Sequence, residues 1–288
     1  MYLKSKIIFF FTLFIFSLSV FAQPIIAQYF GIWLNRGQTW QQKLRSDTPF
    51  DKLNRVYVSF GKIITVNEHL SIAFDGNTAH AVQLIQRIHT QNPKADIFLT
   101  VGGSDDNQSF GGAANDPEFA INVLHFLNKY NLNGFDIDWE NDLNQQDLNT
   151  LVTHLYSVLH AAGDKLTLDV WPYPFSAYDM TVLKNNLNQI NIMSYGATTP
   201  LDNSVSAFQQ AGFPVNKMIG GVETETDYPG GTDTLGSSGS IAQKANYALQ
   251  NGLAGMMGWR LDNDYATEDN PNYPTYQGAI QLWATMHK

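Results

Sequence analysis

Two patterns of hydrophobic residues alternate along the chain, one typical of β-strands and one typical of helices. Short runs of β-branched and aromatic residues have the length of β-strands, and between them apolar residues recur every three or four positions, as on the buried face of a helix. Glycine, proline and polar residues separate the two kinds of segment. The strand pattern occurs in eight runs: Ile25–Trp33, Val56–Phe60, Ile97–Val101, Gly134–Trp139, Leu166–Trp171, Ile190–Tyr195, Met218–Val222 and Gly255–Trp259.

Helix-boundary residues flank several of the helical segments. Asn77 is placed to cap one helix, and residues 116–118 (Asp-Pro-Glu) combine a cap, a first-turn proline and an acid that suits the helix dipole. Gly163 follows the helical stretch Leu148–His160, as glycine does at helix ends. Weaker helical patterns occupy Trp40–Arg45, Asp179–Asn188, Ser204–Gln210, Ser240–Gln250 and Tyr276–His287.

Eight strands that alternate with about eight helices predict an α/β fold, a single (β/α)8 barrel. The main alternative is a doubly wound open sheet, which usually carries a glycine-rich phosphate-binding turn after its first strand, and QYFGIWLNRG has no such motif. The Gly/Ser-rich segment Pro229–Ser240 resembles a linker, but only about 30 residues separate the seventh and eighth strands. We therefore interpret it as a surface loop and expect no α/β insertion domain.

The first 22 residues have the pattern of a secretory signal. Lys4 and Lys6 precede an apolar run at Ile7–Phe16, and small residues at Val20 and Ala22 suit cleavage after Ala22. An uncleaved membrane anchor is the alternative, but the run is short against the roughly 20 residues that span a bilayer. We expect a barrel at residues 23–288 that is secreted to a periplasm or the exterior and has no membrane contact after cleavage.

Charge and cysteine content narrow the possible partners. The formal charge is −9 at pH 7, and loss of the two lysines in the first 22 residues takes it to −11, which disfavours nucleic acid and leaves a neutral polymer open. The absence of cysteine excludes thiol catalysis and cysteine-bound zinc. The seven histidines form no H-x-x-x-H pair, so we expect neither a metal nor a cofactor.

The stretch NGFDIDWEN carries the strongest chemical signal. Asp136, Asp138 and Glu140 occupy alternate positions of a strand, so they share one face at a spacing of about 6.6 Å, while apolar residues fill the other. In a barrel these acids would climb the inside towards the catalytic end, with Glu140 at the rim. Stacked buried acids cannot all ionise, and a shared proton could make Glu140 a general acid. A solvated edge strand or a calcium site is the alternative, which fits the apolar alternate positions less well.

The same residues carry a resemblance. NGFDIDWE is similar to the D-G-x-D-x-D-x-E signature of glycoside hydrolase family 18, the chitinases and related endo-β-N-acetylglucosaminidases, with Asn133 in place of the first Asp. Three further segments fall in the family's order. They are Thr100–Gly103, which resembles S-x-G-G, Met193–Tyr195, which resembles M-x-Y, and Trp259, which matches the tryptophan beneath the sugar.

The resemblance implies a substrate-assisted retaining mechanism, an exception to the two-carboxylate scheme. Glu140 would protonate the glycosidic oxygen, and the 2-acetamido carbonyl of the substrate would attack C1. Asp138 would orient the acetamido N–H, Asp136 would share a proton with Asp138, and Tyr195 would donate its hydroxyl to the acetamido oxygen. We therefore assign Glu140, Asp138, Asp136 and Tyr195 to catalysis.

Substrate-contacting candidates lie at or near strand ends. We expect Trp259, Met193, Tyr29, Gly103 and Glu223 to bind the sugar, although Tyr29 could instead belong to the core. The implied partner is chitin, a chitooligosaccharide or another GlcNAc-containing glycan, cut internally in an open cleft by a monomer. The GlcNAc-β-1,4-GlcNAc core of an N-glycan stays open as an alternative substrate.

Two features depart from the family pattern or admit another function. Gly196 follows M-x-Y where many members have Asp. Glu140 and Glu223, each at a strand end, could form a two-carboxylate retaining site if their carboxyls lay about 5–5.5 Å apart. A non-catalytic, chitinase-like lectin is a third possibility, but such proteins typically replace the rim acid that this chain keeps at Glu140.

Overall fold

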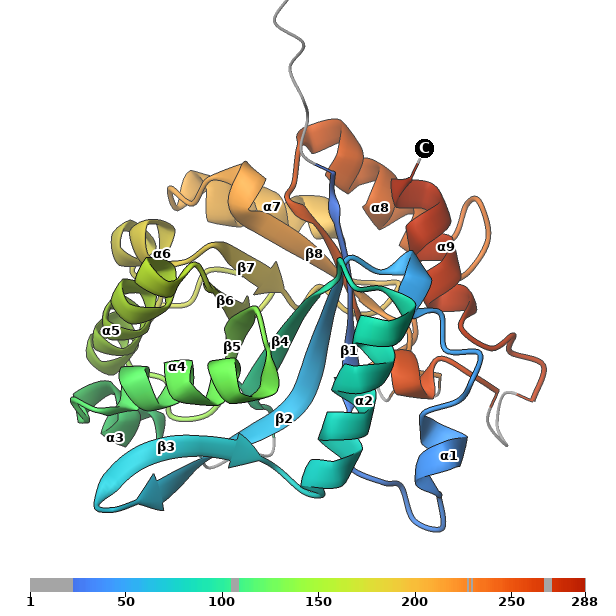
Figure 1. Ribbon diagram of the computed structural model, residues 1–288. Coiled ribbons are helices and arrows are strands. Elements are labelled where there is room, and N and C mark those ends of the chain that lie inside the picture. Colours follow the sequence, from blue (N-terminus) through green and yellow to red (C-terminus); the bar gives the residue numbers. More distant parts are fainter. Residues whose placement is uncertain (1–22, 105–108, 227, 229, 267–270, 288) are drawn as a thin grey trace, which may run out of the picture.

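Eight parallel strands form a closed barrel in the computed structural model, which describes residues 23–104, 109–226, 228, 230–266 and 271–287 (Figure 1). Each strand pairs with the next in order around the barrel, and β1–β2 pairing closes the sheet. The predicted fold class is therefore confirmed, without an evident insertion domain. The barrel strands are β1 (Ile25–Gly31), β2 (Arg55–Val66), β4 (Asp96–Gly102), β5 (Gly134–Asp138), β6 (Lys165–Val170), β7 (Gln189–Ile192), β8 (Met218–Glu223) and β9 (Gly255–Trp259).

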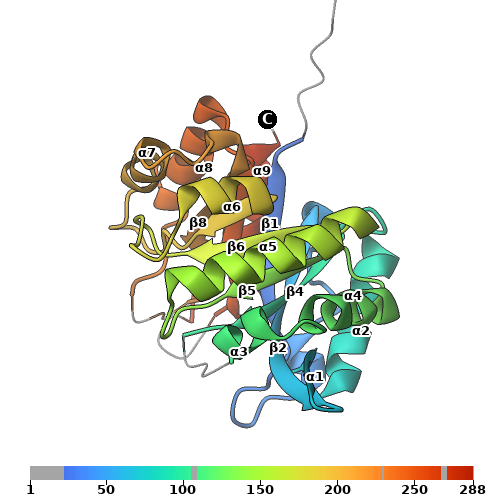
Figure 2. The same ribbon diagram turned by 90° about the vertical axis from the view of Figure 1, so that its left-hand side faces the viewer.

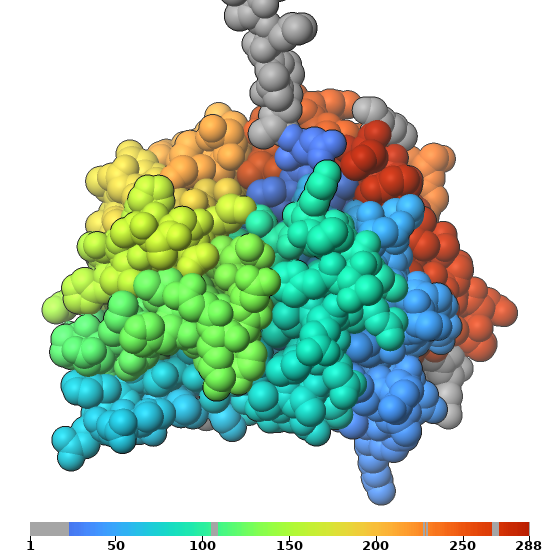
Figure 3. Space-filling model, viewed as in Figure 1, coloured from blue at the N-terminus to red at the C-terminus, as the bar shows by residue number. Residues whose placement is uncertain are grey.

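Helices surround the barrel and return the chain to the amino ends of the strands (Figures 1 and 2). Figure 3 shows this side of the molecule covered largely by the teal to yellow-green part of the sequence, which contains α2, α4 and α5. The helices are α1 (Trp40–Lys43), α2 (Thr78–Gln91), α3 (Phe110–Asn115), α4 (Phe119–Tyr130), α5 (Gln145–Ala162), α6 (Met180–Asn186), α7 (Leu201–Gln210), α8 (Ser240–Asn251) and α9 (Gln277–Met286); single 3-10 turns are η1 (Phe50–Lys52), η2 (Val215–Lys217) and η3 (Leu261–Asn263).

The helix-boundary signals act largely as predicted. Asn77 accepts a hydrogen bond from the Ala79 N–H at 2.9 Å, and Gly163 ends α5 with φ = 89°. Asp116 differs, because α4 begins only at Phe119. One carboxylate oxygen of Asp116 accepts from the Glu118 N–H at 2.9 Å and the other from the Leu70 N–H at 2.6 Å, so Asp116 joins the start of α4 to the preceding hairpin.

That hairpin was not predicted. Strand β2 continues beyond the barrel to Val66 and pairs antiparallel with β3 (His69–Phe74). The turn between them uses Asn67 and Glu68 at positive φ. Phe74 of β3 packs edge-on against Phe126 of α4, so the hairpin rests on a barrel helix rather than forming a domain.

Two cores result from this arrangement. The larger fills the space between barrel and helices, and a smaller one inside the barrel contains Ala27, Tyr29, Tyr57, Phe98, Ile219 and Met257. Towards the carboxyl ends of the strands the interior becomes polar, and the functional candidates lie there. Both ends of the described chain, before β1 and after α9, lie at the opposite end of the barrel (Figure 1).

The signal predicted at residues 1–22 lies outside the described residues. Within the ranges that the structure describes, no helix has the length and apolar character needed to cross a bilayer.

Candidate active site

The register of neighbouring strands surrounds Asp136 with hydrogen-bond donors. Thr100 of β4 and Thr167 of β6 are its partners in the sheet, so all three side chains enter the barrel in one row. Thr100 Oγ1 donates to Asp136 Oδ2 at 2.9 Å, and Thr167 Oγ1 donates to Oδ1 at 2.5 Å. Asn191 Nδ2 of β7 adds a third bond to Oδ1 at 3.1 Å. These bonds satisfy a carboxyl that is fully buried.

A second buried acid, Asp169 of β6, lies beside this row and is only 4% exposed. The Tyr29 hydroxyl donates to Asp169 Oδ1 at 2.6 Å and lies 3.2 Å from Asp136 Oδ2. Tyr29 Oη also accepts from Asn191 Nδ2 at 3.1 Å. Sequence reasoning missed Asp169, although it shares a strand face with Thr167 in LTLDVW and that alternation could have identified it.

The two buried acids differ in what stabilises their charge. Burial raises the pKa of Asp136, while hydrogen bonds, above all those from Thr167 and Thr100, hold it down. Burial raises the pKa of Asp169 well above its usual value, and the charges of Asp136 and Asp138 raise it further. These influences favour a proton held between Asp136 and Asp169, and the sharing between Asp136 and Asp138 that the sequence suggested stays a prediction.

The glycine pair after β4 permits a close backbone approach. The Gly103 N–H donates to the Asp138 carbonyl oxygen at 2.9 Å. Gly102 and Gly103 have φ of +122° and +110°, and a Cβ on Gly102 would lie 1.8 Å from the same oxygen. The T-V-G-G segment thus holds the end of β5, from which Asp138 and Glu140 extend.

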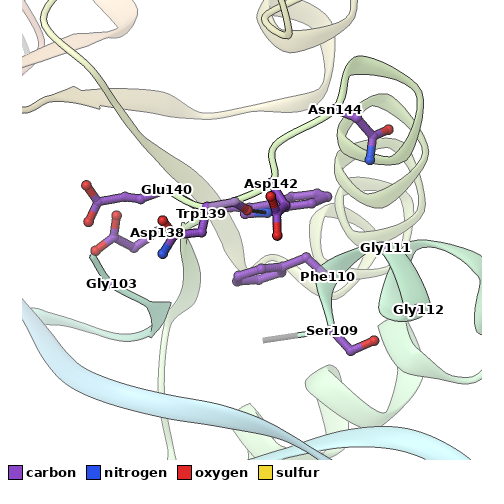
Figure 4. Close-up of a pocket in the computed structure, with 11 residues that line it drawn as sticks. Gly103, Ser109, Phe110, Gly111, Gly112, Asp138, Trp139, Glu140, Asp142 and Asn144 are labelled. Carbon is purple, nitrogen blue, oxygen red and sulfur yellow. Dashed lines mark hydrogen bonds between the residues drawn. The ribbon is translucent and has the colours of Figure 1, made fainter. Parts of the chain in front are cut away.

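Glu140 is half-buried at the rim, directly above the nearly buried Asp138. Figure 4 shows both carboxyls pointing to the same side, away from Trp139, which stacks on Phe110 with centroids 5.0 Å apart. A cavity of about 270 Å³ adjoins them. Its lining is Gly103, Ser109, Phe110, Gly111, Gly112, Asp138, Trp139, Glu140, Asn141, Asp142 and Asn144.

Three half-buried aromatic rings lie close together on neighbouring parts of the barrel: Trp33 just after β1, Phe60 within β2 and Trp259 at the end of β9. Phe60 stacks on Trp33 with centroids 5.6 Å apart and planes 3° apart, and Trp259 lies 5.7 Å from Phe60. The buried ring of Tyr29 is 5.6 Å from Trp259. Trp259 therefore belongs to a wider aromatic surface suited to a sugar face. Trp33 and Phe60 were not predicted as sugar contacts, although each ends a strand run in the sequence.

Tyr195 is suited to donate a hydrogen bond. It is half-buried within the inner cluster, as is Met193, and its hydroxyl lies 3.7 Å from Met257 Sδ. Burial raises the pKa of Tyr195 well above its usual value, and the carboxylates of Asp169, Glu223, Asp138 and Glu140 raise it further. The phenol therefore keeps its proton.

Gly196 leaves no room for the aspartate that many relatives carry. A Cβ there would lie 2.9 Å from the Gly231 carbonyl oxygen, and φ is +84°. The Gly196 N–H donates to Asp233 Oδ2 at 3.0 Å, and Lys244 Nζ donates to the Gly196 carbonyl at 2.8 Å and to Asp233. These bonds attach the loop of residues 230–239, which follows β8 and resembled a linker in the sequence, to the segment just after β7.

Two expected sugar contacts lie beneath the cleft surface. Tyr29 is 1% exposed and Glu223 is fully buried, so neither side chain reaches a ligand in this arrangement. Glu223 Oε1 accepts from the Glu225 N–H at 2.8 Å, and burial raises the pKa of Glu223 well above its usual value. Among the residues described by the structure, no group of three His, Cys, Asp or Glu side chains is arranged to hold a metal ion.

Comparison with known proteins relates this geometry to one family. The sequence model of Glycosyl hydrolases family 18 matches residues 25–228. A class V chitinase of Medicago truncatula is 26% identical over 140 residues, 41% of this chain and 37% of that protein, so the match spans little more than a third of this relative.

Solved structures share the fold. A mutant class V chitinase from Nicotiana tobaccum in complex with NAG4 matches at a TM-score of 0.73 and 14% identity, covering 92% of this chain and 99% of that one. Human YKL-39, described as a pseudo-chitinase with retained chitooligosaccharide binding, matches at 0.75 and 16%, covering 92% and 100%. The family model includes the NGFDIDWE segment and two of the three further resembling segments, and on this evidence the chain belongs to glycoside hydrolase family 18.

Proposed function

We propose that the protein is a retaining, endo-acting hydrolase that cleaves β-1,4 linkages after N-acetylglucosamine in chitin or chitooligosaccharides. The main support is the row of acids along β5 and just beyond its end. Glu140 is half-exposed at the rim, above Asp138 and the buried Asp136. One acid at the surface supported by acids beneath suits a reaction in which the substrate brings its own nucleophile.

In this mechanism the Glu140 carboxyl gives its proton to the glycosidic oxygen as the bond to C1 breaks. The 2-acetamido carbonyl oxygen forms a bond to C1 and gives an oxazolinium ion. Asp138 accepts a hydrogen bond from the acetamido N–H, and the protonated Tyr195 hydroxyl donates one to the acetamido oxygen. Water then attacks C1, the bond between C1 and the acetamido oxygen breaks, and Glu140 takes a proton from the water, which restores the carboxyl and the acetamido group with net retention.

The cleavage pattern tests this proposal. On chitohexaose we expect initial products with the β-anomeric configuration and cuts at internal bonds, because no insertion domain deepens the cleft. A thiazoline that mimics the oxazolinium ion should inhibit tightly. Initial α-anomers would overturn retention, and release of dimers alone from one end would overturn endo action.

Tyr195→Phe should lower kcat by about 10²-fold, since the acetamido oxygen loses a positioned donor as its charge develops, and should change KM only a few-fold. Steady-state kinetics on a chitooligosaccharide measures both parameters. Tyr156→Phe on α5 is the matched control, because Tyr156 stacks on His160 outside the site. An unchanged kcat in Tyr195→Phe would remove this donor from the mechanism.

Other functions receive less support. Glu223 is buried and its pKa is raised, so it is poorly suited to act as the ionised nucleophile of a two-carboxylate site. Covalent trapping of Glu223 by a fluorosugar would reverse this preference.

A lectin function remains as a family alternative, as does an N-glycan core substrate, and parallel assays on chitohexaose and a high-mannose glycoprotein distinguish these outcomes.

The N-terminal signal, secretion and a monomeric state belong to the same proposal. The signal and secretion are supported by the basic start and apolar run ahead of Ala22. Exported protein should begin at Gln23, and N-terminal sequencing after expression with the native leader would show this.

A further inference from the structure

We infer that Asp169 is a positioning residue for the proposed reaction: as a neutral carboxylic acid, it donates a hydrogen bond to Asp136 and fixes that carboxylate beneath Asp138. The inference rests on the proposed function for its kinetic part, and on geometry for its proton assignment.

The sheet places Asp169 where it can act on both acids of β5. Strand β6 pairs with β5 through Ile137 and Leu168, so the next residues, Asp138 and Asp169, enter the barrel from adjacent strands. On its other side Asp169 pairs with Asn191 of β7. With 4% of its surface exposed, Asp169 depends on these neighbours instead of water to stabilise a charge.

Proton counting assigns the neutral form to Asp169. The Tyr29 hydroxyl lies 2.6 Å from Asp169 and 3.2 Å from Asp136, so the two carboxyls are neighbours around one oxygen. Asp169 lowers the pKa of Asp136 as a hydrogen-bonding neighbour, and two carboxylates contain no proton with which to make such a bond. Asp136 accepts from Thr100, Thr167 and Asn191 at 3.1 Å or less, which suits a carboxylate.

Tyr29 completes this assignment. Its single hydroxyl proton lies towards Asp169, since the oxygens are 2.6 Å apart against 3.2 Å for Asp136. Asp169 thus accepts from Tyr29 with one oxygen and keeps the other for an O–H that points to Asp136.

The groups that face Asp169 reinforce this arrangement. Asp136 and Asp138 of β5 are acidic, and their charges disfavour a third anion. The remaining titratable neighbours are phenols from the strands and the loops that follow them. They are Tyr29 of β1, Tyr57 of β2, Tyr178 after β6 and Tyr195 after β7. The cation Arg55 stands two residues deeper on β2, where it binds the Tyr57 hydroxyl at 3.2 Å.

Asparagine and alanine substitutions of Asp169 separate a hydrogen-bonding role from a charge. The amide of an asparagine would copy a neutral acid, because it can donate to Asp136 and accept from Tyr29. Asp169→Asn should therefore keep kcat and KM within about threefold of the native chain, while Asp169→Ala should lower kcat by more than about tenfold at similar KM. Equal losses in both variants would show that the charge of Asp169 is needed and would overturn the inference.

Infrared spectroscopy of the full chain without substrate tests the proton itself. At neutral pH several protonated carboxylic acids contribute carbonyl absorption, buried Glu223 among them. The difference spectrum between the native protein and Asp169→Asn should contain one such carbonyl band, and the difference spectrum for the exposed control Asp51→Asn should contain none. A band unchanged by Asp169→Asn would overturn the assignment even if chitooligosaccharides are cleaved. Conversely, loss of the band in a protein that cleaves nothing would support the assignment and reject the proposed function.

The pH dependence of stability gives an independent measure. A carboxyl whose pKa is raised on folding binds its proton more tightly in the folded chain, so stability falls as pH rises from about 3.9, the usual Asp pKa, towards the raised value. Asp169→Asn removes this loss. Its Tm relative to the native protein should thus be higher at about pH 8 than at about pH 4, and an equal difference at both values would overturn the inference.

Discussion

Glu140→Gln should lower kcat on chitooligosaccharides by about 10²- to 10⁴-fold, the range that a positioned general acid supplies. Glutamine fills the same space but cannot transfer a proton to the leaving oxygen. Glu140 is half-buried at the rim, so the exchange should leave the aromatic surface and the acids beneath undisturbed. Initial rates from reducing-end release measure kcat, and calorimetry with a chitooligosaccharide measures Kd, which should change only a few-fold.

Glu68→Gln in the β2–β3 turn is the control for this exchange, because Glu68 is exposed on the hairpin. It should retain native rates. Turnover of Glu140→Gln above about a tenth of native would remove the proposed acid. Binding without turnover in the native protein itself would instead favour the lectin function.

Gly102→Ala should have the largest effect on stability, a loss of about 3 kcal/mol or more in the free energy of unfolding. The new Cβ would lie 1.8 Å from the Asp138 carbonyl oxygen, and the contact is with backbone that cannot rotate away. Either β5 shifts and displaces Asp138, or the steric clash remains and destabilises the folded chain. The free energy of unfolding in urea and kcat should therefore both fall.

Gly163→Ala separates this collision from the cost of positive φ. Gly163 has φ = +89° at the end of α5, and a Cβ there would meet nothing within 4 Å. We expect a loss of about 1 kcal/mol with unchanged kcat. If Gly102→Ala were no more harmful than Gly163→Ala, the close approach between β4 and β5 would not be a requirement of the site.

The barrel was predictable because each strand is a local signal and the alternation with helices is regular. The hairpin was missed because residues 63–66 continue a strand run without a glycine turn, and Asn67 and Glu68 supply positive φ instead. Helix α3 was missed because FGGAAN is short and glycine-rich. In both cases packing against neighbouring elements outweighs weak local preference.

The site was predictable where its residues are close in sequence. Asp136, Asp138 and Glu140 form a visible period on one strand, whereas Asp169 is a single acid whose importance depends on register with β5. Tyr29 and Glu223 lie on barrel strands as expected, but their depth follows from the surrounding side chains. The reason for glycine at position 196 is its contact with the loop of residues 230–239, and no local sequence pattern predicts where that loop lies.

Both ends of the described chain lie on the side of the barrel away from Glu140. A carrier, dye or solid support attached at either end would thus leave the carboxyl ends of the strands, where Glu140 lies, pointing away from the attachment. In protein immobilised by either end, the carboxyl ends of the strands would stay accessible to the proposed polymeric substrate.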